Sequence, residues 1–71
     1  MRQLKFHIKS IREEKGISQG QLAVMTGVSQ SAISDIENNK RNPSLWTVQM
    51  ISDVLGVPVD DLVEVRSDED M

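Results

Sequence analysis

The chain has 71 residues, of which 38% are apolar, and a formal net charge of −3. This length allows one domain and lies near the lower limit at which a single hydrophobic core stabilises a fold. The chain has no cysteine and one histidine, which excludes disulfides and argues against thiolate or histidine metal centres. No apolar run approaches the roughly 20 residues of a membrane-spanning helix, and no secretory segment follows Met1. We therefore expect a cytoplasmic protein that has no cofactor and no contact with membranes.

The charges are distributed unevenly along the chain. Residues 1–58 carry seven Lys and Arg side chains against five Asp and Glu, a balance of +2. Residues 59–71 carry one cation against six anions, a balance of −5. A mildly basic body is compatible with binding to nucleic acid despite the negative total. We expect one domain over residues 1–65 and an acidic, mobile tail over residues 66–71.

Local signals predict helices in chain order and no strand. Glycine or asparagine follows four helical stretches, where it can adopt the left-handed conformation that ends a helix. Ser18, Ser29 and Ser44 each precede a stretch whose free backbone N–H groups they can cap. No alternating β-branched run is flanked by hairpin turns. The pattern predicts an all-α, compact five-helix bundle with helices over residues 5–15, 19–26, 30–37, 45–55 and 59–64.

The second and third predicted helices have the pattern of a helix-turn-helix motif. The connection T-G-V-S is so short that the helices must cross steeply around shared apolar residues. Ala23 allows the close approach, and Gly27 tolerates a positive φ in the turn. The wedge between the helices would be filled by Leu22, Val28, Ile33 and Ile36. In this plan the second helix of the pair usually enters the DNA major groove.

The outward face of the helix over residues 30–37 carries short polar side chains. These are Gln30, Ser31, Ser34, Asp35 and Asn38. Glutamine can make two hydrogen bonds to adenine, serine can contact any base edge, and aspartate can accept from cytosine. Two cations, Lys40 and Arg41, follow where a phosphate backbone would lie. Together these features favour DNA recognition over a helix face that only meets water.

These stretches resemble the Cro/Xre type of helix-turn-helix domain, the phage-repressor class. From about residue 8 to residue 63 the matching segments are I-R-E-E-K-G-I-S-Q, Q-L-A, G-V-S-Q-S-A-I-S-D-I-E-N, K-R-N-P-S-L and L-G-V-P-V-D-D-L. The resemblance implies a lambda-repressor-like domain that binds operator DNA as a twofold dimer. It implies base contacts from Gln30, Ser31, Ser34 and Asp35. It implies phosphate contacts from Gln19, Ser29, Asn38, Lys40 and Arg41.

Four positions depart from the family pattern: Gly20, Asp35, Asn39, which replaces a common glycine, and Pro58, which occupies the usual serine cap of the last helix. Gly20 stands where a helix-favouring residue is usual, and glycine costs about 1 kcal/mol there relative to alanine. Asp35 puts a negative charge on the reading face, where it either reads a cytosine or pairs with a nearby cation.

Arg12 falls on the apolar face of the first helix, where an unpaired guanidinium would be costly. Glu37 is its natural partner, and we expect this ion pair to fix the packing of the reading helix.

Two apolar groups are candidates for contacts with proteins. Trp46 and Met50 lie one turn apart on the outward side of the fourth helix, where they pack within the domain, bind a protein partner or touch the DNA backbone. The last helix and its preceding loop carry more apolar residues than a short helix needs. We expect a homodimer surface among Val57, Val59, Leu62, Val63 and Val65.

The expected function is that of a sequence-specific DNA-binding transcriptional regulator, a repressor that binds an inverted-repeat operator as a dimer. One alternative is the antitoxin of a toxin–antitoxin pair, with the acidic tail and the Trp46/Met50 pair as contacts to the toxin. Another is a protein-interaction module of the same fold that does not bind DNA. An enzyme is not expected, because the sequence offers no nucleophile–base pair, carboxylate dyad or phosphate-binding loop.

Overall fold

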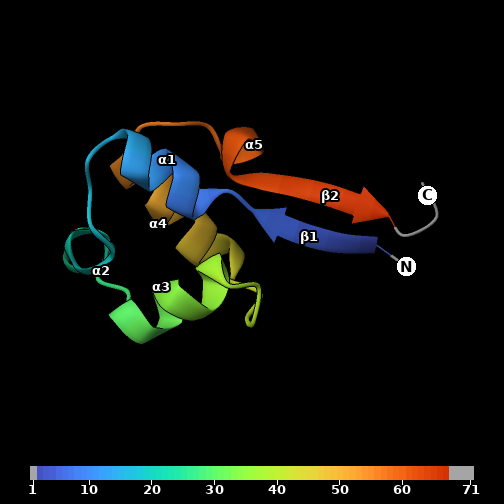
Figure 1. Ribbon diagram of the computed structural model, residues 1–71, viewed down its shortest axis with the longest axis horizontal. Coiled ribbons are helices and arrows are strands. Elements are labelled where there is room, and N and C mark those ends of the chain that lie inside the picture. Colours follow the sequence, from blue (N-terminus) through green and yellow to red (C-terminus); the bar gives the residue numbers. More distant parts are fainter. Residues whose placement is uncertain (1, 68–71) are drawn as a thin grey trace.

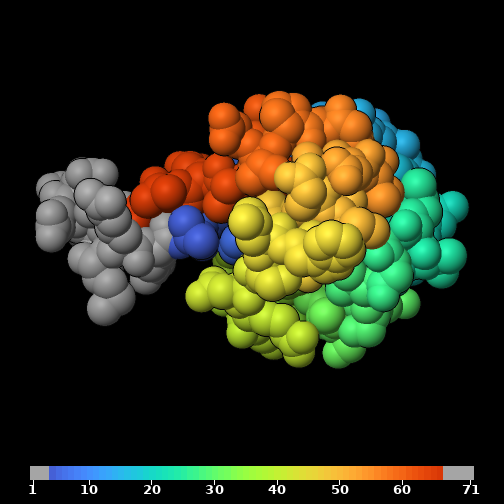
Figure 2. Space-filling model, turned by 180° about the vertical axis from the view of Figure 1, so that it is seen from behind, coloured from blue at the N-terminus to red at the C-terminus, as the bar shows by residue number. Residues whose placement is uncertain are grey.

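The computed structural model describes residues 2–67, which form five helices and a two-stranded sheet (Figure 1). The elements are β1 (Arg2–Phe6), α1 (Ile8–Glu14), α2 (Gln19–Thr26), α3 (Gln30–Glu37), α4 (Leu45–Leu55), α5 (Val59–Leu62) and β2 (Val63–Ser67). The helices form a compact body, and the strands form a ribbon that projects from one end of it (Figure 1, and seen from behind in Figure 2). No helix in this part of the chain is long and apolar enough to cross a membrane.

Helices α2, α3 and α4 begin and end at the residues expected from the sequence, because each is bounded by its own capping residues. The Oγ of Ser29 accepts the backbone N–H of Ala32 at 3.1 Å, and Ser44 caps α4 in the same way. Gly27 ends α2 at a φ of 76°, and Gly56 ends α4 at a φ of 70°. These capping interactions join residues that are close in the sequence, so they define the helix ends independently of how the helices pack.

The five expected helices are present, but the all-α description is only approximate, because residues 2–6 and 63–67 pair as an antiparallel ribbon. Leu4 lies opposite Val65, and Phe6 lies opposite Val63. Phe6 is buried in the core and Val63 packs against it, so the inner half of the ribbon completes the hydrophobic core. Apolar and polar residues alternate over only four positions of each strand, and no hairpin turn connects the strands.

The strands also change the boundaries of the first and last helices. Helix α1 begins at Ile8 rather than residue 5, and α5 ends at Leu62 rather than residue 64. The backbone N–H of His7 donates to the carbonyl oxygen of Leu62 at 2.8 Å, which ties the two strand–helix junctions together. Strand β2 extends to Ser67, so the first two residues of the expected tail belong to the fold. The rest of that tail, residues 68–71, lies outside the described residues.

One hydrophobic core holds the helices and the ribbon together. Its buried members come from β1 and from all five helices, and Val63 of β2 packs against them. The buried members are Phe6, Ile8, Leu22, Ile33, Ile36, Val48, Ile51, Leu55 and Leu62. The molecule measures 38 Å along its longest axis and 20 and 19 Å across, and the ribbon runs along the long axis (Figure 1).

Candidate nucleic-acid interface

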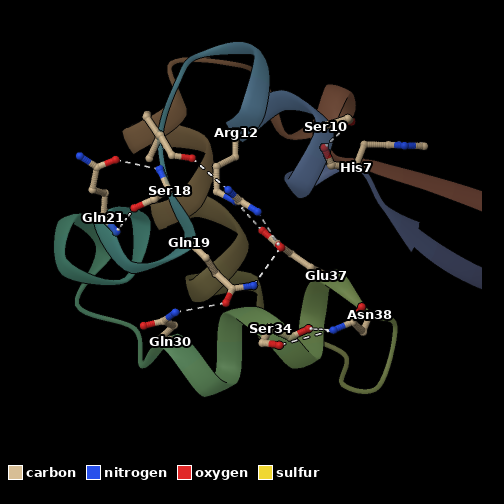
Figure 3. A network of polar contacts seen from close by, with 11 residues as sticks. His7, Ser10, Arg12, Ser18, Gln19, Gln21, Gln30, Ser34, Glu37 and Asn38 are labelled. Carbon is tan, nitrogen blue, oxygen red and sulfur yellow. Dashed lines mark hydrogen bonds and ion pairs between the residues drawn. The ribbon is translucent and has the colours of Figure 1, made fainter.

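The N-terminus of α2 is organised by a reciprocal pair of hydrogen bonds. The Oγ of Ser18 accepts the backbone N–H of Gln21 at 3.0 Å, and the Oε1 of Gln21 accepts the backbone N–H of Ser18 at 2.8 Å. This capping box satisfies two backbone donors at the start of the helix. Gln19, the first residue of α2, is thereby held in a defined position beside α3 (Figure 3).

The turn between α2 and α3 is closed by Thr26. Its buried hydroxyl donates to the carbonyl oxygen of Leu22 at 2.8 Å and accepts the backbone N–H of Val28 at 3.2 Å. The residues expected to fill the wedge between the helices do so: Leu22, Ile33 and Ile36 are buried, and Ala23 and Val28 pack against them. The steep crossing of α2 and α3 therefore rests on both packing and hydrogen bonds.

The polar face of α3 lies at the surface of the molecule. Gln30 and Ser31 are exposed, and Ser34 and Asp35 are half-buried. Figure 1 shows α3 along one flank of the helical body, on the side away from β2. The four residues assigned to base reading thus lie on one accessible helix, within its first six positions.

Arg12 and Glu37 form a buried ion pair that joins α1 to the last turn of α3. The Nε of Arg12 lies 2.8 Å from Glu37 Oε2, and its Nη2 lies 3.1 Å from Glu37 Oε1. The third nitrogen, Nη1, donates to the carbonyl oxygen of Ile17 at 3.0 Å. The two side chains are only 9% and 2% exposed. The hydrogen bond to Glu37 raises the pKa of Arg12, so the guanidinium stays charged.

Gln19 connects this ion pair to Gln30, the first residue of α3. Its Nε2 donates to Glu37 Oε1 at 3.1 Å, and its Oε1 accepts from the Nε2 of Gln30 at 3.4 Å (Figure 3). Gln19 was assigned to phosphate from the sequence. In the structure both ends of its amide are engaged within the protein, so it also sets the direction of the Gln30 side chain.

Gly20 lies beneath the side chain of Gln30, but this contact does not explain the glycine. A Cβ placed on Gly20 would lie 3.5 Å from the Oε1 of Gln30, which is an ordinary van der Waals distance. The side chain of Gln30 therefore passes directly over Gly20. The space does not require glycine at this position.

Asn38 and Ser29 take local roles at the two ends of α3. The Nδ2 of Asn38 donates to the carbonyl oxygen of Ser34 at 2.9 Å and approaches the Ser34 Oγ at 3.4 Å. Asn38 thus covers the C-terminal end of the helix. The Ser29 Oγ accepts a hydrogen bond as the N-cap, which leaves its hydroxyl proton free to donate outward.

The basic loop after α3 bends back toward the reading helix. The backbone N–H of Lys40 donates to the carbonyl oxygen of Asp35 at 2.8 Å, and Asn39 adopts a φ of 60° in the turn. The Nη2 of Arg41 lies 3.3 Å from the Oδ2 of Asp35. Sequence reasoning had left open whether Asp35 pairs with a cation, and in the structure it does. The two residues are six positions apart across a helix end, and no i, i+3 or i, i+4 rule applies to them. The sequence therefore does not predict this ion pair.

The other candidate apolar groups lie on α4. Trp46 is 73% exposed at the start of α4, whereas Met50 is half-buried one turn later. Leu45, the first residue of α4, is also exposed. Within residues 2–67, no three His, Asp or Glu side chains come close enough to share a metal ion.

The sequence and the fold were compared with those of known proteins. Residues 8–62 match the model of a helix-turn-helix family. The chain is 41% identical over 56 residues to an immunity repressor protein of Bacillus phage phi105, a match that covers 79% of this chain and 39% of that protein. It is 42% identical over 60 residues to the transcriptional regulator SinR of Bacillus subtilis strain 168, covering 83% of this chain and 54% of SinR. The chain thus spans about half or less of the length of these relatives.

Solved structures share the fold as well. The restriction-modification controller protein C.AhdI from Aeromonas hydrophila superposes with a TM-score of 0.74 at 28% identity, covering 76% of this chain and 82% of that chain. A candidate DNA-binding protein from Bacteroides fragilis superposes with a TM-score of 0.81 at 29% identity, covering 87% of this chain and all of that chain. The match to the family model extends from the first residue of α1 to the last residue of α5. The chain therefore belongs to the helix-turn-helix family.

Proposed function

We propose that this chain is a sequence-specific DNA-binding transcriptional regulator that represses transcription by occupying an inverted-repeat operator as a dimer. The observation that carries the proposal is the polar, accessible face of α3, held in place by the Arg12–Glu37 pair and followed by two cations. The names of its relatives, an immunity repressor and a transcriptional regulator, support it. This role would place the protein in the cytoplasm with the chromosome.

In this proposal base reading and phosphate binding fall to different residues. Gln30, Ser31, Ser34 and Asp35 face the base edges in the major groove, where amides, hydroxyls and carboxylates distinguish base pairs. The phosphate contacts fall to Gln19, Ser29, Asn38, Lys40 and Arg41. Backbone contacts position the protein without reading sequence, so Lys40 and Arg41 supply affinity and α3 supplies specificity. The ion pair makes this possible because it fixes α3 against α1.

A second function has one supporting observation, the exposed Trp46. A tryptophan that is 73% exposed on a small domain is suited to anchor a protein partner. On this reading the protein would be an antitoxin that binds its operator through α3 and a toxin through Trp46 and Met50. An interaction module without DNA binding would leave the polar face of α3 and the two cations without a role.

The proposal is tested by selecting bound sites from a random pool of double-stranded DNA. We expect an inverted repeat whose half-site centres are about 10–10.5 base pairs apart, one helical turn. Affinity for the selected site should fall steeply as salt rises, because Lys40 and Arg41 displace counterions. Recovery of no enriched sequence would contradict the proposal, and recovery of direct repeats would contradict the twofold arrangement.

A further inference from the structure

The apolar side chains that the sequence suggested for a dimer surface are mostly used inside the domain. Leu62 is fully buried, and Val57, Val59 and Val63 pack against the core. Of these five residues Val65 alone is largely exposed, at 62%, and it lies in the ribbon rather than in the last helix. Of the residues expected to form a dimer surface, Val65 on the ribbon is therefore the one still accessible to a second copy.

The exposed end of the ribbon has a definite apolar face. Val65 lies directly opposite Leu4, and directly opposed residues project from the same face of a sheet. Side chains two positions apart along a strand also share a face, so this pair lies on the same side as Phe6 and Val63. Phe6 and Val63 enter the core, whereas Leu4 is 46% exposed. Leu4 and Val65 thus continue the apolar surface of the core beyond the helical body.

The side chains of Lys5, Glu64 and Arg66 alternate onto the other face. Lys5 lies opposite Glu64 in the register. Glu64 accepts hydrogen bonds from His7 at 2.8 Å and from Arg66 at 3.2 Å. This polar cluster occupies the face that remains in water when the apolar face is covered. Burying these charges would be costly, but covering Leu4 and Val65 leaves them in water.

From this arrangement we propose that the apolar face of the ribbon, formed by Leu4 and Val65, is the surface through which two copies of the chain associate, with their ribbons packed face to face. The inference rests on the proposed function, because an inverted-repeat operator has twofold symmetry and is bound by a twofold dimer. A second copy brings the same apolar pair, so the surface is complementary to itself, as a twofold interface must be. Association would join the two hydrophobic cores through the ribbons.

The position of α3 relative to the ribbon fits this arrangement. In Figure 1 the ribbon runs along the longest axis, β1 lies on the side of β2 that faces α3, and α3 lies along that flank of the body. In the face-to-face dimer, the twofold axis runs between the two ribbons, perpendicular to the strands and in the direction from β2 to β1. Rotation about this axis keeps both α3 helices on the same flank and places them toward opposite ends of the dimer. Both helices can then enter successive major grooves on one side of a duplex. Pairing the ribbons edge to edge would turn the two helices to opposite flanks.

The first test measures self-association of the full chain without DNA, by sedimentation equilibrium. The double variant Leu4→Thr, Val65→Thr retains residues that suit a strand but removes the apolar contact. We expect the wild type to dimerise, and we expect the dissociation constant of the double variant to rise by about tenfold or more, because four apolar side chains per dimer lose their burial. Val24→Thr is the matched control, since Val24 is 84% exposed on α2, and it should leave association unchanged. Circular dichroism verifies that each variant is folded.

A second test keeps the inference falsifiable if the threonine variants do not fold. The chain has no cysteine, so Val65→Cys introduces a single thiol. A bismaleimide that spans about 10 Å, the separation of two packed sheets, should join two copies of Val65→Cys and should not join Val24→Cys. A dimer that survives both threonine substitutions overturns the inference, as does a wild type that stays monomeric both alone and on DNA. Self-association through the ribbon without selection of any DNA site would uphold the inference and contradict the proposed function instead.

Discussion

The guanidinium Nη2 of Arg41 lies 3.3 Å from the Oδ2 of Asp35, so a residue assigned to phosphate and a residue assigned to bases are paired in the free protein. Both side chains are substantially exposed, and such surface pairs contribute little to stability. The pair matters for binding, because a phosphate has to compete with Asp35 for Arg41. Asp35 also repels phosphate directly, within the roughly 8 Å over which charges act at physiological salt.

Replacing Asp35 by alanine should release Arg41 and remove one repelling charge. We expect Asp35→Ala to bind random-sequence duplexes more tightly at low salt, with a salt slope steeper by about one unit. If Asp35 also accepts from a cytosine, the preference at one base pair should weaken by about 1–3 kcal/mol. Fluorescence anisotropy at several salt concentrations measures both effects. As a control, Asp53→Ala removes the same charge from an exposed site on α4 and should change neither the salt slope nor the base preference. An unchanged salt slope for Asp35→Ala would show that the pair does not restrain Arg41.

Gln30 and Lys40 should respond differently to truncation, because one is assigned to bases and the other to phosphate. Gln30→Ala should relax the preference at one position of the site, at a cost of about 1–3 kcal/mol for the preferred base. Lys40→Ala should weaken all sequences alike and lower the salt slope by about one unit. Competition between selected and mismatched duplexes distinguishes the two patterns. Lys9→Ala, on α1, serves as the charge control, and an equal loss on every duplex for Gln30→Ala would remove α3 from the reading role.

Breaking the buried ion pair should destabilise the domain strongly. Glu37→Ala leaves the guanidinium of Arg12 buried without its carboxylate, which typically costs about 3–5 kcal/mol. Replacing both partners by apolar residues, as in Arg12→Met with Glu37→Leu, should recover most of that loss because no charge remains buried. Urea denaturation provides the free energies of unfolding. Equal losses for the single and double variants would mean that the hydrogen bonds to Ile17 and Gln19, rather than charge burial, dominate the stability of this site.

Gly20→Ala should stabilise the protein by up to about 1 kcal/mol, because alanine is the better helix former and the new methyl group meets Gln30 at an ordinary distance. For a domain of this size that corresponds to a rise in Tm of about 4–8 °C. Gly27→Ala is the opposite control, since its φ of 76° is unfavourable for alanine. Thermal unfolding followed by circular dichroism measures both. A lower Tm for Gly20→Ala would show that the contact with Gln30 is tighter than this geometry indicates.

The pKa of Glu64 should depend on His7. The hydrogen bond from His7, followed by that from Arg66, holds the pKa of Glu64 below its usual value of 4.5. A lowered pKa in the folded state means that the ionised carboxylate stabilises the fold above pH 4.5 and that this contribution is lost as pH falls through the lowered value. His7→Ala should therefore raise the pKa of Glu64 and weaken the loss of stability on acidification. NMR titration of the carboxyl group measures the pKa of Glu64. An unchanged pKa in His7→Ala would contradict the role of His7. Arg66→Ala should raise the pKa of Glu64 by less than His7→Ala does.

Much of the candidate site could be predicted from the sequence, because its elements are bounded by local chemistry. Ser18 and Ser29 cap the two helices, and Gly27 makes the turn between them, each through hydrogen bonds or backbone angles within a few residues. The polar face of α3 follows from helical periodicity alone. The ion pair of Arg12 with Glu37 could also be anticipated, since a guanidinium on an apolar helix face requires a partner.

The sequence by itself determined the three central helices, the helix-turn-helix and the family. The tertiary structure alone decided where the chain ends meet. Leu4 pairs with Val65 across sixty positions of sequence, so no hairpin turn joins the two strands, and β1 contains no β-branched residue. The same holds for the hydrogen bonds that Gln19 makes to Glu37 and Gln30, and for the contact between Asp35 and Arg41. These contacts depend on how completed helices and loops lie against one another, and local propensity carries no information about that.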